Sequence, residues 1–239
     1  DTVLPESPLF KPEYADAYVN FDPDTANKLL DELGLDKRDS DGIRLLPDGR
    51  RAEITVETAG ESNLDTDVLE LVHDHWANIG LALFTRTSQR DVFRNRAMSG
   101  SIMMSIWYGL DNGVPTADMS PYGLAPTLDD QLQWPLWGMY YLSAGQEGKA
   151  PDLPEAAELV DLLNQWGASA TTEEREVIWH KMLSLYTQQV FSIGLINSTL
   201  QPILRSAKMQ NVPEHALYGF DPTSFLGVYM PDTFWFKEA

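Results

Sequence analysis

The chain has 239 residues, 43% of them hydrophobic, which is enough for one large domain or two small ones with a buried core. It carries 17 basic and 36 acidic residues, and the net charge of −19 argues against binding a nucleic-acid backbone or an anionic membrane surface. It contains no cysteine, which excludes disulfides, thiolate nucleophiles and zinc–thiolate sites.

The amino-terminal part has proline and no clear periodicity, so we expect residues 1–21 to form an extended lead-in. The chain does not begin with Met, and we expect a mature chain or a piece of a longer protein. Asp22 and Pro23 favour a helix start, and Gly34 favours its end. A hairpin is predicted next, with strands at 43–46 and 52–58.

Residues 52–107 alternate between strand and helix patterns. A capping box of Asp67 and Glu70 predicts a helix that Gly80 ends. Further predicted elements are a strand over 81–87, a helix over 91–98 and a strand over 101–107. This alternation predicts an α/β sheet with at least some parallel pairing.

Residues 108–150 interrupt the pattern with proline, glycine and aromatic residues, and a loop of this length tends to be functional. Part of it is predicted to be helical around 131–141. Two helices should follow, one over 153–166 and one from a capping box of Thr171 and Glu174 to about residue 189, and then a strand over 190–196.

The end of the 101–107 strand is the main candidate site, because ligands of open α/β sheets bind beyond the carboxyl ends of strands. Aromatic rings here and in the following loop would supply stacking walls, and Asp111 would pair with a cationic group such as an α-ammonium. The alternative is that the rings fill a core and that Asp111 forms an Asp-Asn-Gly turn. The aromatic candidates are Trp107, Tyr108, Trp134, Trp137, Tyr140 and Tyr141.

Catalytic and metal signatures are weak. His73 and His75 lie two residues apart, which puts them on different helix faces, and no zinc motif occurs. A calcium-loop pattern around Asp39 and Asp41 fails at its other positions. No serine-nucleophile elbow, phosphate loop or dinucleotide motif is present. We therefore expect no catalytic residue, no metal and no cofactor, although a glycoside-hydrolysing Asp/Glu pair in 108–150 remains an alternative.

Two segments resemble bacterial extracellular solute-binding proteins of the peptide, oligopeptide and nickel class. Residues 21–58 hold the Phe-Asp-Pro, Ala, Leu-Leu and Gly of the segment that opens that family's second lobe, followed by a hairpin. Residues 67–109 are similar to its helix–strand–helix–strand unit, with a Trp-x-x-Ile-Gly-Leu helix end. The resemblance covers roughly residues 20–205, and the order and spacing of the motifs carry it.

The resemblance implies the second lobe of a two-lobed type II periplasmic-binding-protein clamshell, an α/β fold with a mixed sheet flanked by helices. The implied division is a lead-in over 1–21, a ligand-binding lobe over 22–205 and a segment over 206–239 that returns toward the first lobe. The implied function is extracytoplasmic capture of a peptide or related solute, on the periplasmic or extracellular face, by a monomer that delivers it to an ABC importer permease. A secreted carbohydrate hydrolase and a purely structural interaction domain are the alternatives.

The resemblance also implies site residues. Dipeptide-type binders of the family carry Trp-x-Gly-Asp-Asn-Gly-x-Pro after this strand, and their Asp pairs with the amino terminus of the peptide. Here Trp107 to Pro115 match that motif with Leu110 as one extra residue, which gives Asp111 the amino-binding role. The aromatic segment 134–141 departs from the simple peptide binders. The implied ligand-binding set is Trp107, Tyr108, Asp111, Asn112, Trp134, Trp137 and Tyr140.

Overall fold

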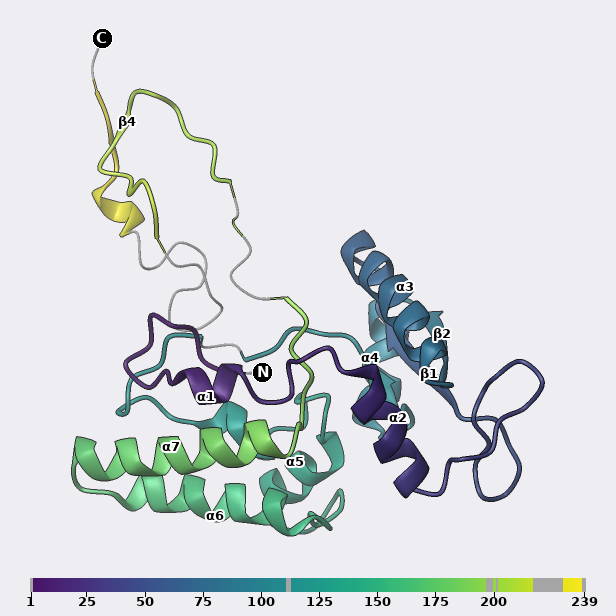
Figure 1. Ribbon diagram of the computed structural model, residues 1–239. Coiled ribbons are helices and arrows are strands. Elements are labelled where there is room, and N and C mark those ends of the chain that lie inside the picture. Colours follow the sequence, from purple (N-terminus) through teal and green to yellow (C-terminus); the bar gives the residue numbers. More distant parts are fainter. Residues whose placement is uncertain (1, 111–112, 197–199, 201, 217–229, 238–239) are drawn as a thin grey trace. The chain divides into compact units, whose positions relative to one another are not determined.

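The computed structural model describes residues 2–110, 113–196, 200, 202–216 and 230–237 (Figure 1). The chain divides into two compact units, each described by itself below. Unit 1 comprises Asp1–Ala17, Tyr108–Ala125 and Asp152–Ala239, and unit 2 comprises Tyr18–Trp107 and Pro126–Pro151. The boundary between Trp107 and Tyr108 therefore coincides with the end of the predicted 101–107 strand.

Unit 2 is built around a three-stranded parallel sheet of order β2-β1-β3. Its elements are α2 (Pro23–Glu32), β1 (Glu53–Thr58), α3 (Asn63–Asn78), β2 (Ala82–Thr87), α4 (Arg90–Met98), β3 (Met104–Ser105) and α5 (Pro135–Leu142). The predicted α/β pattern with parallel pairing is confirmed.

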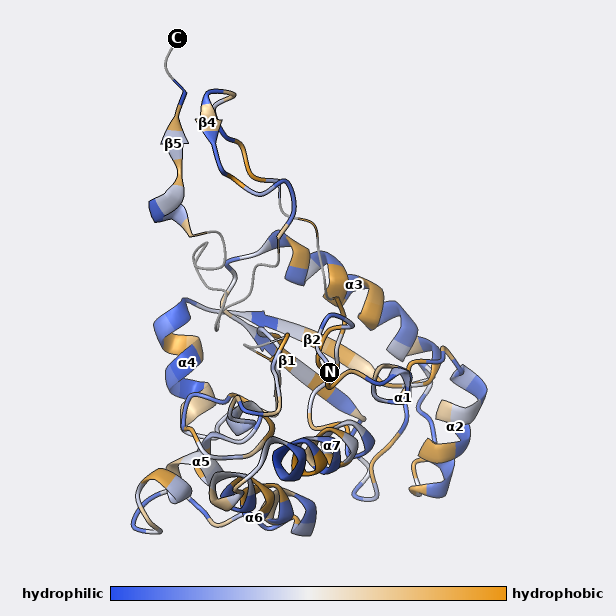
Figure 2. Cartoon of the chain, turned by 90° about the vertical axis from the view of Figure 1, so that its left-hand side faces the viewer, coloured by the Kyte–Doolittle hydropathy of each residue, from blue (hydrophilic) through white to orange (hydrophobic). Residues whose placement is uncertain are grey.

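The core of unit 2 lies between this sheet and α3, which Figure 1 draws alongside β1 and β2. Val56, Leu69 and Leu83 form its fully buried centre, and Trp76 and Ile106 pack against it. The helix reaches the sheet because its apolar residues recur every three or four positions. By contrast, Figure 2 shows hydrophobic stretches on α2, where no residue is buried.

Unit 1 contains a helix pair that Figure 1 draws side by side, α6 (Pro154–Ala168) and α7 (Thr172–Gln188). Leu159, Met182 and Leu183 are fully buried in this unit. Its remaining elements are α1 (Pro12–Ala15), η1 (Tyr122–Leu124), β4 (Met209–Gln210), η3 (Pro231–Thr233) and β5 (Trp235–Phe236). The strands β4 and β5 pair antiparallel, so parallel and antiparallel pairing both occur, in separate sheets.

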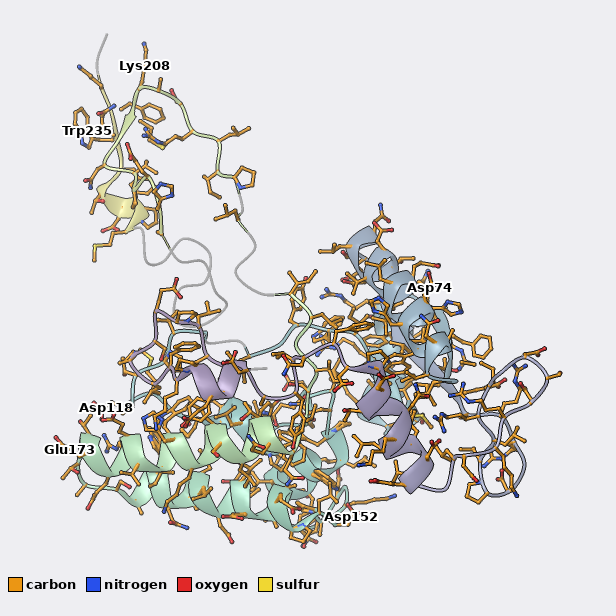
Figure 3. The ribbon with its side chains drawn as sticks, in the orientation of Figure 1. Asp74, Asp118, Asp152, Glu173, Lys208 and Trp235 are labelled. Carbon is orange, nitrogen blue, oxygen red and sulfur yellow. The ribbon has the colours of Figure 1, made fainter. Side chains whose placement is uncertain are left out.

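Hydrogen bonds within unit 1 hold residues 117–119 against α6 and α7. The indole N–H groups of Trp166 and Trp179 donate to the carbonyls of Ala117 and Met119. Asp118, labelled in Figure 3, accepts hydrogen bonds from both Thr172 and Arg175 at the start of α7. These contacts leave residues 117–119 bound to the helix pair, although they form no helix or strand.

Helix starts follow the capping chemistry in two of the three cases that the sequence singles out. Asp22 accepts the N–H of Thr25, and Thr171 and Glu174 form the predicted capping box. The predicted start at Asp67 is wrong, because Ser62 caps the helix earlier by accepting the N–H of Leu64. No proline or glycine interrupts residues 63–66, so the helix extends back to that cap.

The predicted strand over 43–46 is wrong, since this stretch makes only isolated bridges. Part of the predicted hairpin pairing is present, since the Leu46 N–H donates to the Arg50 carbonyl and the Ala52 N–H donates to the Arg44 carbonyl. The Arg44 and Leu45 N–H groups donate instead to the carbonyls of Gly80 and Lys37. The Arg44 side chain is 1% exposed and binds Asp31, Asn27 and the carbonyls of Leu35 and Ile79. The stretch therefore pairs at isolated positions rather than in a regular ladder, and the Arg44 side chain joins segments that are scattered along the chain.

Three further expectations differ from the structure. The strand predicted over 101–107 pairs with β1 only at Met104–Ser105, opposite Val56 and Glu57, whereas β1 pairs with β2 along its whole length. Residues 190–196 form no strand, and Val190, with φ of 52°, has a left-handed backbone that strands do not use. The lead-in over 1–21 is not extended throughout, because it contains α1.

Candidate functional site

Trp107 lies just beyond the carboxyl end of β3, as the sequence predicts. Its ring stacks on Phe93 of α4, with 5.4 Å between centroids and 29° between planes, and Phe93 is fully buried. The Arg90 guanidinium carbon lies 5.3 Å from the centroid of the Trp107 ring, within cation–π range. Trp107 exposes 37% of its surface.

The same edge of the sheet holds a buried carboxylate. Glu57, near the end of β1, accepts two hydrogen bonds from Arg96 of α4, at 2.9 Å from Nε and 2.6 Å from Nη2. Arg86 of β2 makes a longer contact with the same carboxylate at 3.4 Å. The hydrogen bonds from Arg96, with the positive charges of Arg96 and Arg86, hold the pKa of Glu57 below its usual range despite its burial.

A second carboxylate at this edge is exposed. Glu61 follows β1 and accepts two hydrogen bonds from Arg90, the first residue of α4. These bonds lower the pKa of Glu61. Both carboxylates are therefore ionised at neutral pH and hold no proton for a general acid to transfer.

The aromatic residues of the following segment divide by exposure. Trp134 is 3% exposed, its indole N–H donates to Gln131 at 2.9 Å, and its ring stacks on Trp137 with 6.4 Å between centroids. Trp137 and Tyr140 both lie on α5, and Tyr140 is exposed. Of the two interpretations that the sequence leaves open, this geometry favours core packing for Trp134.

Three further predicted site residues follow Trp107 in the chain. Tyr108 belongs to unit 1 and is largely exposed. Asp111 and Asn112 lie outside the described residues. Trp107 itself contacts Phe93 and Arg90 of α4.

Sequence reasoning missed Glu57, Glu61, Arg90 and Phe93. A signal was present, because Glu57 and Glu61 flank the end of the predicted strand 52–58 and Arg90 follows the end of strand 81–87. The carboxyl ends of parallel strands share one edge of a sheet. Residues that follow each of the three strands are therefore site candidates, not only those that follow the last strand.

Metal binding finds no support in the placement of the histidines and acidic residues. Among the described residues, no three His, Asp or Glu side chains converge in a way that would hold a metal ion. His180 Nδ1 lies 3.0 Å from the Tyr14 hydroxyl, an interaction that joins α1 to α7. Burial, and then the nearby Lys11 charge, lowers the pKa of His180.

Across the described ranges, no helix has both the length and the apolar character needed to cross a bilayer.

Comparison with known proteins identifies the family. The family model described as bacterial extracellular solute-binding proteins, family 5 Middle, matches residues 1–129. The oligopeptide-binding protein OppA is 28% identical with a TM-score of 0.75, and the match covers 99% of this chain and 39% of that one. Comparison with curated protein sequences gives no significant match.

Other solved structures share the fold at lower identity. The stachyose complex of the periplasmic binding protein MelB from Agrobacterium fabrum C58 is 18% identical, with a TM-score of 0.70, over 99% of this chain and 34% of that one. The pentapeptide complex of an oligopeptide-binding protein from Thermus thermophilus is 19% identical, with a TM-score of 0.54, over 79% of this chain and 31% of that one.

This chain spans no more than 39% of the length of these solved structures. A family-model match over more than half of the chain, together with the α/β architecture, settles its membership. The chain belongs to family 5 of the bacterial extracellular solute-binding proteins and has part of the fold of type II periplasmic binding proteins.

Proposed function

We propose that this chain is part of the solute-capture component of an ABC importer, that it supplies the second lobe of a two-lobed binding protein, and that its solute is a peptide. The observation that carries this proposal is Trp107, a partly exposed ring held on Phe93 and Arg90 at the carboxyl edge of a parallel sheet. Solutes of α/β proteins bind at that edge, and aromatic walls are typical of small-molecule clefts.

Peptide is the proposed solute class because the relative with the highest identity quoted above is an oligopeptide-binding protein. The fold alone would not choose a solute, since proteins that share it have been solved with stachyose and with a pentapeptide. A permease of the importer is the proposed partner, and we propose that the protein acts as a monomer.

We propose that the protein binds its solute without changing it, rather than hydrolysing a carbohydrate. A glycosidase needs one carboxylic acid that keeps its proton near neutral pH, and that requires a raised pKa. The pKa values of Glu57 and Glu61 are lowered by their arginine partners, and that of Asp118 is lowered by Arg175 and Thr172. These three carboxylates are thus better suited to fixing side chains than to donating protons.

For the amino terminus of the peptide we propose Asp111, with Asn112 beside it, on the strength of the family motif alone. Asp111→Asn should then weaken binding of a peptide with a free amino terminus and leave its N-acetylated form unaffected. Asp48→Asn, which alters a surface carboxylate of unit 2, is the matched control. Equal weakening for both peptides would contradict the amino-binding role.

The test of the proposed function uses the complete gene product, unfolded and refolded to remove bound solute. Penta-alanine and stachyose are each added while thermal unfolding is followed, and the solutes are then recovered and weighed by mass spectrometry. We expect penta-alanine to raise the unfolding temperature and to be recovered intact, because a solute that binds only the folded state stabilises it. Stabilisation by stachyose alone would overturn the peptide assignment, and cleavage of either solute would overturn capture without chemistry.

A further inference from the structure

Residues from the loops after all three parallel strands of unit 2 meet at one edge. Glu61 follows β1, Arg90 follows β2, and Trp107 follows β3. Arg90 contacts both of the others: it donates to the Glu61 carboxylate from Nε at 2.6 Å and from Nη2 at 2.5 Å, and its guanidinium lies over the Trp107 ring. The loops are thereby joined to one another by side chains at this edge.

The backbone brings the first two loops together before these side chains meet. Thr58 accepts the N–H of Ser88 at its carbonyl and that of Gly60 at its hydroxyl. Gly60 has φ of 67°, and a Cβ there would stand 2.4 Å from Thr87 Cγ2. Only glycine adopts this positive φ without strain and leaves room for Thr87 Cγ2. The turn at Gly60 places Glu61 beside the start of α4.

The paired hydrogen bonds fix the plane of the guanidinium. A carboxylate that accepts from Nε and Nη2 of one arginine restrains its orientation as well as its position. Trp107 is consequently supported in two ways, by the buried Phe93 ring and by a guanidinium whose plane Glu61 sets. Glu61 and Arg90 are each 46% exposed, so the attraction between their charges alone is screened and the geometry matters more.

We propose that Glu61 and Arg90 are positioning residues that hold the partly exposed Trp107 ring in one orientation, ready to contact a bound solute. This inference rests on the proposed function for its last step, because the solute is the proposed partner of the ring. A ring that is already ordered loses less side-chain freedom on binding, which improves affinity without a new contact. Neither positioning residue needs to touch the solute.

The first measurement needs no solute. The complete gene product is labelled with fluorotryptophan, and the Trp107 line in the fluorine NMR spectrum is assigned with Trp107→Phe. We expect Glu61→Gln and Arg90→Lys to shift and broaden the Trp107 line while the other tryptophan lines stay in place. Lysine keeps the charge but cannot form the paired contact. An unchanged Trp107 line in either variant would overturn the positioning role.

A matched control removes a different pair of the same kind. Arg50 Nε donates to Asp48 at 2.7 Å in unit 2, and both side chains are exposed. Asp48→Asn should leave the Trp107 line where it is in the unaltered protein. If Asp48→Asn moved the Trp107 line as far as Glu61→Gln does, the effect would be a general one of surface charge, and the proposal would fail.

The second measurement uses penta-alanine as the probe in a calorimetric titration. We expect Glu61→Gln to weaken its binding roughly 3- to 10-fold, the cost of ordering a side chain of this size on binding. The loss should vanish in a Trp107→Ala background, since Glu61 then has no ring to position. A loss that persists there would overturn the proposal. If the unaltered protein binds no penta-alanine, the proposed function fails, and the fluorine line still decides whether Glu61 and Arg90 position the ring.

Discussion

The Glu57 carboxylate receives two hydrogen bonds from Arg96, and this pair ties the end of β1 to α4. Glu57 is buried while Arg96 is only partly exposed, so the carboxylate depends on the arginine for compensation of its charge. Phe93, which supports Trp107, lies on the same helix one turn earlier. The pair therefore fixes the helix on which the candidate site is built.

Unfolding should depend on pH through Glu57. Its pKa is lowered in the folded state, so it contributes stability that is present above its unfolded pKa of about 4.3 and is lost as the pH falls through the folded value. Glu57→Gln should cost roughly 1–3 kcal/mol at about pH 7. Urea titrations of both proteins should show this difference shrinking toward about pH 3. A constant difference across that range would contradict the assignment.

Arg44 should matter to stability more than any exposed arginine of unit 2. Arg44→Met leaves Asn27 and the carbonyls of Leu35 and Ile79 without their donor, at a cost of about 3 kcal/mol. Arg50→Met, at an exposed position, should change the free energy of unfolding by under about 0.5 kcal/mol. Urea unfolding measures both. Equal effects would mean that the buried hydrogen bonds of Arg44 add nothing.

Gly60 should tolerate alanine less well than another glycine with positive φ. Gly34 has φ of 82° and open space around it. Gly34→Ala should therefore lower the free energy of unfolding by about 1 kcal/mol, because of the strained backbone conformation alone. Gly60→Ala adds the contact with Thr87 Cγ2, and Thr87→Ser should remove that added part. The comparison is made by thermal unfolding. The account of the loop would be wrong if Gly60→Ala cost no more than Gly34→Ala.

Alanine substitutions at Trp134 and Tyr140 should differ in their effect on stability, because Trp134 packs in a core and Tyr140 is exposed. Trp134→Ala removes a buried ring and the donor to Gln131, and should cost roughly 3–5 kcal/mol of stability. Tyr140→Ala, at an exposed position of α5, should change stability little. Chemical denaturation checks both values. A small cost for Trp134→Ala would restore its role as a wall of the binding site.

Most of the helices of both units could be predicted from the sequence, because helix periodicity and capping are local patterns. Asp22, Thr171 and Glu174 act at short range, and each does what its chemistry predicts. The start of α3 was misplaced because Ser62 and Asp67 offer competing caps, and the sequence alone does not rank them. The length of β3 depends on its pairing with β1, which is a property of two segments.

The sequence predicts Trp107 as a site residue but not the side chains that contact it. Trp107 stands at a strand end, and that can be inferred from one segment. Its partners Arg90 and Phe93 come from α4, and Glu61 comes from the loop after β1, so only the folded sheet brings them together. Arg44 was missed for the same reason, since its partners lie on segments scattered along the chain.

The most direct test of the central claim is the affinity of the complete gene product for penta-alanine, measured by calorimetry with Trp107→Ala. The account predicts a loss of roughly 10-fold or more, because a partly exposed aromatic residue at the centre of a site contributes much of its binding energy. Phe84→Ala is the control, since Phe84 is an exposed aromatic residue of β2 that lies before the carboxyl end of its strand. Unchanged affinity in Trp107→Ala, or an equal loss in Phe84→Ala, would contradict the claim that this edge of the sheet binds the solute.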